Sequence, residues 1–171
     1  MPAVKIADRF SSLQPSSMIK IFQAAAAVED LSNLSIGEPD FHTEPEIVNA
    51  AAKAALEGCT HYPPLQGFED LRKEICAYWK RHHGLETEPE SILLTVGGLQ
   101  AAHLCFQAML DPGDEVVIAE PCFTAYFQQV ENNGGVVVPV PSREENGFFP
   151  TAEDFEKAVT PKTKILVINS P

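Results

Sequence analysis

The stretch Ile92-Leu-Leu-Thr-Val-Gly-Gly-Leu-Gln-Ala-Ala-His-Leu-Cys-Phe-Gln-Ala-Met-Leu110 decides the fold of this chain. Its first five residues are β-branched or leucine, which is the composition of a short buried strand. Two glycines follow, and from Leu99 the apolar residues recur at helical spacing, at Ala102, Phe106 and Met109. The sequence therefore predicts a strand over 92–96 that turns through Gly97 and Gly98 into a helix over 99–110.

This turn is also a candidate anion site. A strand that enters a helix through two glycines brings backbone N–H groups to one point, where the helix dipole favours a phosphate. An ordinary strand–helix turn explains the same residues equally well. The sequence contains neither G-x-G-x-x-G nor the P-loop motif. The phosphate interpretation therefore needs support from the rest of the chain.

Strands and helices continue to alternate after this stretch. A turn over 111–114 leads to strands over 115–119, 136–140 and 164–169, with a helix over 123–132 between the first two. Thr151 and Asp154 form a capping pair for a helix through Val159. Alternation at this spacing predicts an α/β domain with a largely parallel sheet.

The residues before this region predict three helices and one irregular loop. A helix is expected from Met18 to about Val28, and a second starts at a capping box of Thr43 and Glu46. The loop over 60–67 contains two prolines and a glycine, so it cannot be regular. The helix that follows has an apolar stripe on which Tyr78 and Trp79 are predicted core side chains rather than ligand contacts.

Composition narrows the class of protein. The net charge of −12 over 171 residues argues against nucleic-acid and acidic-membrane partners. The sequence shows neither a signal peptide nor a run that would span a bilayer. Four cysteines without a C-x-x-C pair predict reduced, buried thiols in a cytoplasmic protein, and the histidine spacing predicts no metal site.

Several separated motifs together resemble the N-terminal part of the class I/II aminotransferases, which use pyridoxal 5′-phosphate. The match extends over about residues 30 to 171, and each motif is weak alone, so the order and spacing carry the resemblance. The motifs are Ile36-Gly-Glu-Pro-Asp-Phe41, His61-Tyr-Pro-Pro-Leu-Gln-Gly67 with Leu71-Arg72, Thr95-Val-Gly-Gly-Leu-Gln-Ala101, Leu110-Asp-Pro-Gly-Asp-Glu-Val116, Glu120-Pro-Cys-Phe-Thr-Ala-Tyr126, Glu144-Glu-Asn-Gly-Phe148, Thr160-Pro-Lys-Thr-Lys164 and Asn169-Ser-Pro171.

The resemblance implies a fold and a domain organisation. The chain would form part of the large, mostly parallel-sheet domain of a fold type I pyridoxal-phosphate enzyme of the aspartate aminotransferase type. Residues 1–33 would be an N-terminal segment contributing to a small domain or arm, and 34–171 a partial cofactor-binding domain cut at its C-terminal end. In this family the strands at 115–119 and 136–140 pair, whereas later strands are expected to separate those at 92–96 and 164–168 from them.

The resemblance also implies site residues. Gly98, Leu99 and Gln100 match positions that bind the cofactor's phosphate through backbone N–H groups. Phe123 matches an aromatic ring that stacks on the cofactor and borders the substrate; phenylalanine keeps the stacking but lacks the indole N–H of the tryptophan that is frequent there. Gly37 matches a backbone position against the substrate carboxylate, with a turn glycine as the alternative.

Tyr62 matches a tyrosine whose hydroxyl reaches the cofactor phosphate of a neighbouring subunit, which implies a homodimer. A core tyrosine is the alternative. The family's Schiff-base lysine has no counterpart among the chain's lysines in the expected context, so the chain is expected to be inactive alone. The implied function is amino-group transfer between an amino acid and a 2-oxo acid. A non-catalytic truncated or interaction module, and a related lyase or synthase, remain alternatives.

Overall fold

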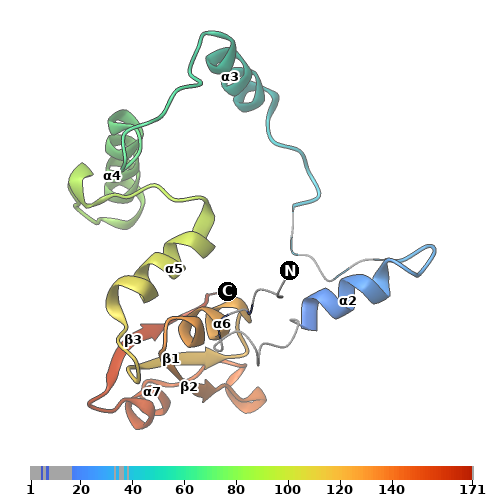
Figure 1. Ribbon diagram of the computed structural model, residues 1–171, viewed down its shortest axis with the longest axis vertical. Coiled ribbons are helices and arrows are strands. Elements are labelled where there is room, and N and C mark those ends of the chain that lie inside the picture. Colours follow the sequence, from blue (N-terminus) through green and yellow to red (C-terminus); the bar gives the residue numbers. More distant parts are fainter. Residues whose placement is uncertain are drawn as a thin grey trace. The chain divides into compact units, whose positions relative to one another are not determined.

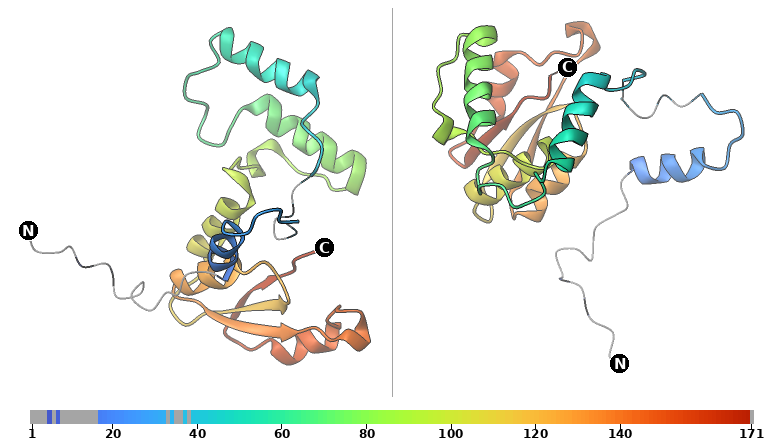
Figure 2. Two further views of the ribbon diagram at one scale, coloured as in Figure 1. Left: turned by 90° about the vertical axis from the view of Figure 1, so that its right-hand side faces the viewer. Right: turned by 90° about the horizontal axis from the view of Figure 1, so that it is seen from above.

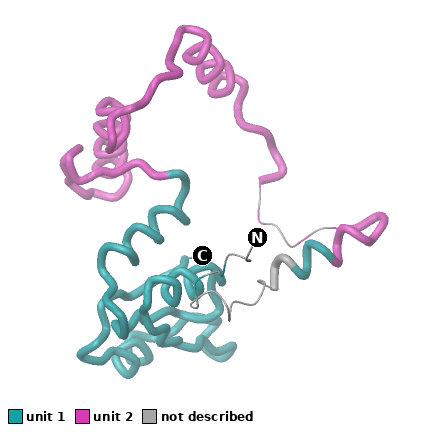
Figure 3. The backbone as a smooth tube through the Cα atoms, in the orientation of Figure 1, with its two compact units in different colours: residues 1–23, 96–171 teal, residues 24–95 magenta. Residues whose placement is uncertain are grey.

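The computed structural model describes residues 5, 7, 17–32, 34, 37 and 39–170. The chain divides into two compact units, residues 1–23 with 96–171 and residues 24–95 (Figure 3). The first is called the sheet unit and the second the helical unit. Within the described ranges, no helix is both long and apolar enough to cross a membrane. The predicted boundary between residues 33 and 34 stays a prediction.

The sheet unit is built on three parallel strands, β1 (Glu115–Glu120), β2 (Val136–Pro141) and β3 (Thr163–Val167). Their order is β2-β1-β3, so β1 lies in the middle and pairs along both edges (Figures 1 and 2). The α/β class and the parallel sheet predicted from the alternating pattern are confirmed.

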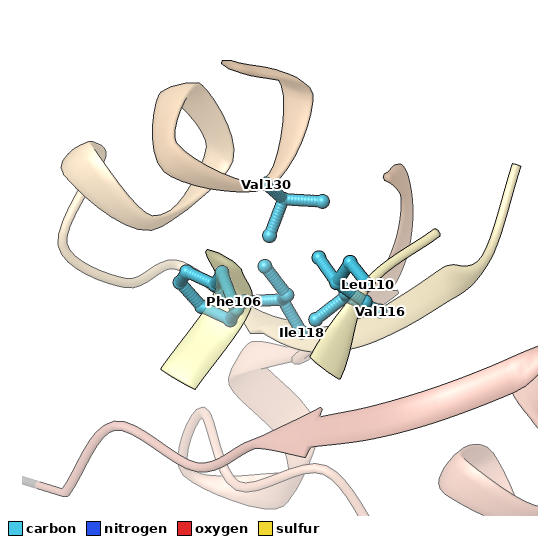
Figure 4. Packing of buried hydrophobic residues seen from close by; sticks show 5 residues of the cluster. All are labelled: Phe106, Leu110, Val116, Ile118 and Val130. Carbon is cyan, nitrogen blue, oxygen red and sulfur yellow. The ribbon is translucent and has the colours of Figure 1, made fainter. Parts of the chain in front are cut away.

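The core of the sheet unit lies between β1 and two helices, α5 (Gly97–Met109) and α6 (Ala125–Asn132). Val116 and Ile118 of β1 are fully buried against Phe106, Leu110 and Val130 (Figure 4). Each such side chain contributes about 1.5–3 kcal/mol when removed from water. The packing is close enough that a Cβ at Gly135 would lie 2.9 Å from atoms of both Leu110 and Val130.

Two expectations about strands are wrong. The segment 92–96 has extended backbone at Ile92 (φ −100°, ψ 126°), but it forms no strand within the described chain. The amide of Leu94 instead donates to the carbonyl of Gln66 at 3.1 Å. The fourth predicted strand is not separated from the second either, because β3 pairs directly with β1. A strand's composition predicts extended backbone, whereas its neighbour depends on distant residues.

The helical unit contains α3 (Pro45–Leu56), α4 (Glu69–His83) and the short helix η1 (Pro89–Ser91), while α2 (Ser17–Ala25) crosses the division between the units. Gly84 ends α4 in the left-handed conformation (φ 67°), as a C-terminal glycine should. The capping box expected at Thr43 is wrong. Glu44 is the N-cap of α3, and no side chain caps that end.

Two predictions of burial are also wrong. Tyr78 and Trp79 on α4 are 48% and 38% exposed rather than buried. The four cysteines are free, but Cys59 and Cys105 are exposed and Cys76 and Cys122 only partly buried. An apolar stripe predicts that something covers it without identifying the covering group.

A capping box does form at the last described helix, α7 (Ala152–Ala158), which packs against β2. The Thr151 hydroxyl accepts from the amide of Asp154 at 3.3 Å, and the Asp154 carboxylate accepts from the amide of Thr151 at 2.9 Å. We predict that Thr151→Ala lowers the free energy of unfolding by about 1 kcal/mol in urea. Thr43→Ala is the matched control and should change it little. An equal loss in both variants would contradict the assignment.

The same box predicts a dependence on pH. The Thr151 hydroxyl and then its amide bond the Asp154 carboxylate and lower its pKa, with smaller contributions from Arg143 and Lys157. A lowered pKa in the folded state stabilises α7 above the usual aspartate range, and this stabilisation is lost as the pH falls through the lowered pKa. We expect amides of α7 to exchange faster in acid, and the acid effect should be absent in Asp154→Asn.

Candidate functional site

The site begins where α5 starts, at the double glycine. The helix begins at Gly97, two residues earlier than predicted, with Val96 as N-cap. Gly97 has φ +74°, a left-handed conformation that a residue with a side chain rarely adopts. The Gln100 side chain folds back, and its Oε1 accepts from the amide of Val96 at 2.5 Å. This contact gives the Val96 amide at the helix end an acceptor from the helix itself.

The amides of Gly98 and Leu99 lie in the first turn of α5, where a helix provides no intrahelical acceptor. A Cβ built at Gly98 meets no other heavy atom within 4 Å, so an approaching group would have open space there. Gln100 is the fourth helical residue, and in a regular helix its backbone N–H faces the carbonyl of Val96. The geometry therefore leaves the backbone amides of Gly98 and Leu99 in the first turn of α5 with open space at Gly98 for an approaching anion.

A contact that the sequence did not predict ties this helix start to α6. The Gln129 side-chain amide donates from Nε2 to the carbonyl of Leu99 at 3.0 Å. Gln129 lies in the middle of α6, and a polar residue on a helix gives no local signal of such a partner. The contact holds the first turn of α5 against the helix that follows Phe123.

Phe123 lies just before α6 with about half of its surface (49%) exposed. Its ring meets Tyr126 edge to face, with ring centres 5.8 Å apart and planes at 88°. This arrangement fixes the ring plane and leaves apolar surface for a second flat group. Phe123, Gly98, Leu99 and Gln100 therefore all belong to the sheet unit.

Beside Phe123, a pocket of about 440 Å³ opens at the carboxyl ends of β1 and β2, lined in part by Glu120, Cys122 and Ser142. The Cys122 thiol donates to the carbonyl of Phe123 at 3.7 Å. Burial, and secondarily the Glu120 carboxylate, raise the pKa of this thiol. Ligands of open parallel sheets bind at the carboxyl ends of the strands.

The other two predicted site residues belong to the helical unit. Tyr62 is fully exposed, so it is not a core tyrosine of that unit. It lines an open pocket with Thr60, His61 and Pro63. Gly37 is exposed, and a Cβ built on it meets nothing within 4 Å. Among the described residues, no cluster of three histidine, cysteine, aspartate or glutamate side chains could hold a metal ion.

Comparison with known proteins gives this site its context. The family model for aminotransferase class I and II matches residues 29–171. The chain belongs to this aminotransferase family. The family uses pyridoxal phosphate as its cofactor. The resemblance drawn from the motifs is therefore confirmed at family level.

Individual relatives agree. The chain is 41% identical over 170 residues to a probable aspartate/prephenate aminotransferase of Thermus aquaticus, covering 97% of this chain and 44% of the relative. It is 42% identical over 172 residues to an aspartate aminotransferase of Geobacillus stearothermophilus, covering 98% and 44%. The chain therefore spans less than half the length of these relatives.

A solved structure shows the same fold. Aspartate aminotransferase from Thermus thermophilus with maleate superposes with a TM-score of 0.93 and 39% identity, covering 99% of this chain and 45% of that one. The fold type I architecture expected for the large domain is thereby confirmed.

The environment of Cys122 leads to a test at the site. Because the pKa of its thiol is raised, Cys122 stays protonated at neutral pH, and the thiolate is the reactive form. We predict that Cys122 is alkylated by iodoacetamide more slowly than the exposed Cys59, measured residue by residue by mass spectrometry. Glu120→Gln removes the second cause of the raised pKa and should speed the reaction. A Cys122 rate equal to that of Cys59 would contradict this environment.

Proposed function

We propose that this protein transfers an amino group between an amino acid and a 2-oxo acid with pyridoxal 5′-phosphate as cofactor. The observation that carries the proposal is the first turn of α5, where a Cβ built at Gly98 meets no other heavy atom within 4 Å, in a chain of the aminotransferase family. Names of relatives include aspartate, aspartate/prephenate and aromatic-amino-acid aminotransferase, which supports an amino-acid substrate. A cytoplasmic location remains part of the proposal.

Each predicted residue has a physical role in this proposal. The amides of Gly98 and Leu99 bind the cofactor's phosphate at the positive end of α5, while the Gln100 side chain accepts from the amide of Val96 and leaves those two amides to the phosphate. Phe123 stacks on the flat ring of the cofactor, which supplies an electron sink for the substrate's α-carbon when bound. The Phe123 ring also keeps water away from the reacting carbon.

Gly37 and Tyr62 belong to the helical unit. Gly37 contacts the substrate in this proposal, and Tyr62 contacts a neighbouring subunit. Gly37 lets backbone approach the substrate carboxylate, which a side chain would obstruct. Tyr62 donates its hydroxyl to the phosphate bound by a second copy of the chain, so the active form is a homodimer. The complete exposure of Tyr62 supports this role, since the described residues of the helical unit do not cover its ring.

A direct assay tests the reaction class. The intact protein should convert an amino acid and a 2-oxo acid into the exchanged pair when pyridoxal phosphate is present. The products are measured by chromatography, with the cofactor omitted as control. Release of pyruvate or carbon dioxide without amino-group exchange would replace this proposal by lyase or decarboxylating chemistry.

The phosphate site gives the next prediction. Gly98→Val in the intact protein should weaken cofactor binding, because the branched side chain fills the open side of the first turn. Hydrogen bonds to charged groups contribute about 1.5–3 kcal/mol each. Loss of one such bond corresponds to a roughly tenfold to hundredfold higher dissociation constant, measured by titration of cofactor absorbance.

A valine elsewhere on α5 provides the control. Ala108 lies exposed in the last turn of the same helix, so Ala108→Val introduces the same side chain on α5 without approaching the first turn. Its cofactor affinity should equal that of the parent protein. An unchanged affinity in Gly98→Val would mean that the double glycine is only a turn.

Tyr62 gives a separate prediction. Tyr62→Phe should weaken cofactor binding by about 0.5–3 kcal/mol, depending on how charged and buried the contact is, since one hydrogen bond to the phosphate is lost. Unfolding in denaturant should change little, because the side chain is exposed. Sedimentation of the intact protein should show a dimer. A variant that unfolds earlier yet binds cofactor normally would show a structural role instead.

A further inference from the structure

Among the described residues, Arg72 is a charged side chain that is buried, with 9% of its surface exposed. It lies in the first turn of α4, and its guanidinium bonds backbone rather than a carboxylate. Nε donates to the carbonyl of Gly67 at 3.3 Å, and Nη1 donates to the carbonyl of Pro89 at 2.6 Å. The arginine thus bridges the end of the 60–67 loop and the start of η1.

Further contacts fix the same turn. Gly67 donates to Pro64 at 2.8 Å, and Leu94 donates to Gln66 at 3.1 Å. The Gln66 side chain reaches the carbonyl of Glu90 at 3.4 Å. Gly67 has φ +95°, and any Cβ there would overlap the side chain of Leu94. The turn over 64–67 is therefore held against 89–94 from several directions, with Arg72 making two of the bonds.

The chain between this turn and Tyr62 is stiff. Pro63 and Pro64 follow Tyr62 directly, and each proline ring holds φ near −65°. A residue before proline is restricted to extended backbone, which limits Tyr62 as well. The orientation of the fixed turn is therefore passed along the two prolines to Tyr62, whose own side chain is wholly exposed.

We propose that Arg72 is a positioning residue that sets the direction in which Tyr62 presents its hydroxyl to the cofactor's phosphate. This inference rests on the role proposed above for Tyr62. Arg72 does not itself touch cofactor or substrate. Its two hydrogen bonds hold the turn over 64–67 in one conformation. That conformation fixes the direction of the segment that contains Tyr62.

A double-mutant cycle on the intact protein tests the proposal, with the dissociation constant of pyridoxal phosphate as the measurement. Arg72→Met removes the donors and keeps an unbranched apolar stem. Tyr62→Phe alone should raise the dissociation constant roughly tenfold, and Arg72→Met alone by up to the same factor. The double variant should bind no more weakly than Tyr62→Phe, because Arg72 acts only through the Tyr62 hydroxyl.

Arg81 provides the matched control. It lies on the same helix, is exposed, and its Nη2 pairs with Glu74 at 2.7 Å. Arg81→Met should leave the dissociation constant unchanged. Amide exchange gives a second measurement, since Gly67 and Leu94 should exchange faster in Arg72→Met and not in Arg81→Met. If Arg72→Met does not fold, Arg72→Lys takes its place in the cycle.

The outcomes separate the inference from the proposal beneath it. Suppose that Tyr62→Phe weakens binding and the Arg72 variant either leaves the dissociation constant unchanged or raises it by a factor that multiplies the Tyr62→Phe factor in the double variant. The positioning role is then overturned and the Tyr62 contact stands. If Tyr62→Phe leaves binding unchanged, both the Tyr62 contact and the positioning role are overturned, while transaminase activity still tests the reaction class. A loss in Arg72→Met that disappears in the Tyr62→Phe background supports the inference.

Discussion

The pairing of β1 on both of its edges is the constraint on which the sheet unit depends. β2 and β3 each hydrogen-bond to β1 and not to one another. Val116, Val117 and Ile118 have no exposed surface. The strand is therefore covered on both faces of the sheet as well as paired on both edges. The loops at its carboxyl end, which carry Phe123 and Cys122, can therefore be exposed without loss of their position.

Much of this unit was predictable because its signals are local. A run of β-branched residues identifies β1 whatever its partners are, and a double glycine before a helical stripe identifies the start of α5. The Thr151–Asp154 box is likewise contained in four residues. The candidate site was predictable for a different reason, since the motifs around Gly98 and Phe123 resemble those of a family whose membership is now shown.

What could not be predicted depends on distant residues. The segment 92–96 has the composition of a strand but bonds a loop instead, since no local feature specifies its neighbour. Trp79 lies on an apolar stripe and yet keeps 38% of its surface exposed. Gln129 and Arg72 each bond a backbone carbonyl far away in sequence, and polar residues on helices usually face solvent. These two contacts support the proposed site without belonging to any spacing pattern.

The bridge formed by Arg72 has a consequence for the conditions under which the 64–67 turn persists. Its acceptors are neutral peptide carbonyls and not carboxylates. Added salt therefore screens no ion pair in this bridge, whereas it weakens the exposed pair of Arg81 and Glu74. The turn over 64–67, which follows Tyr62 in the chain, therefore keeps this bridge at high ionic strength, even in a chain with a net charge of −12.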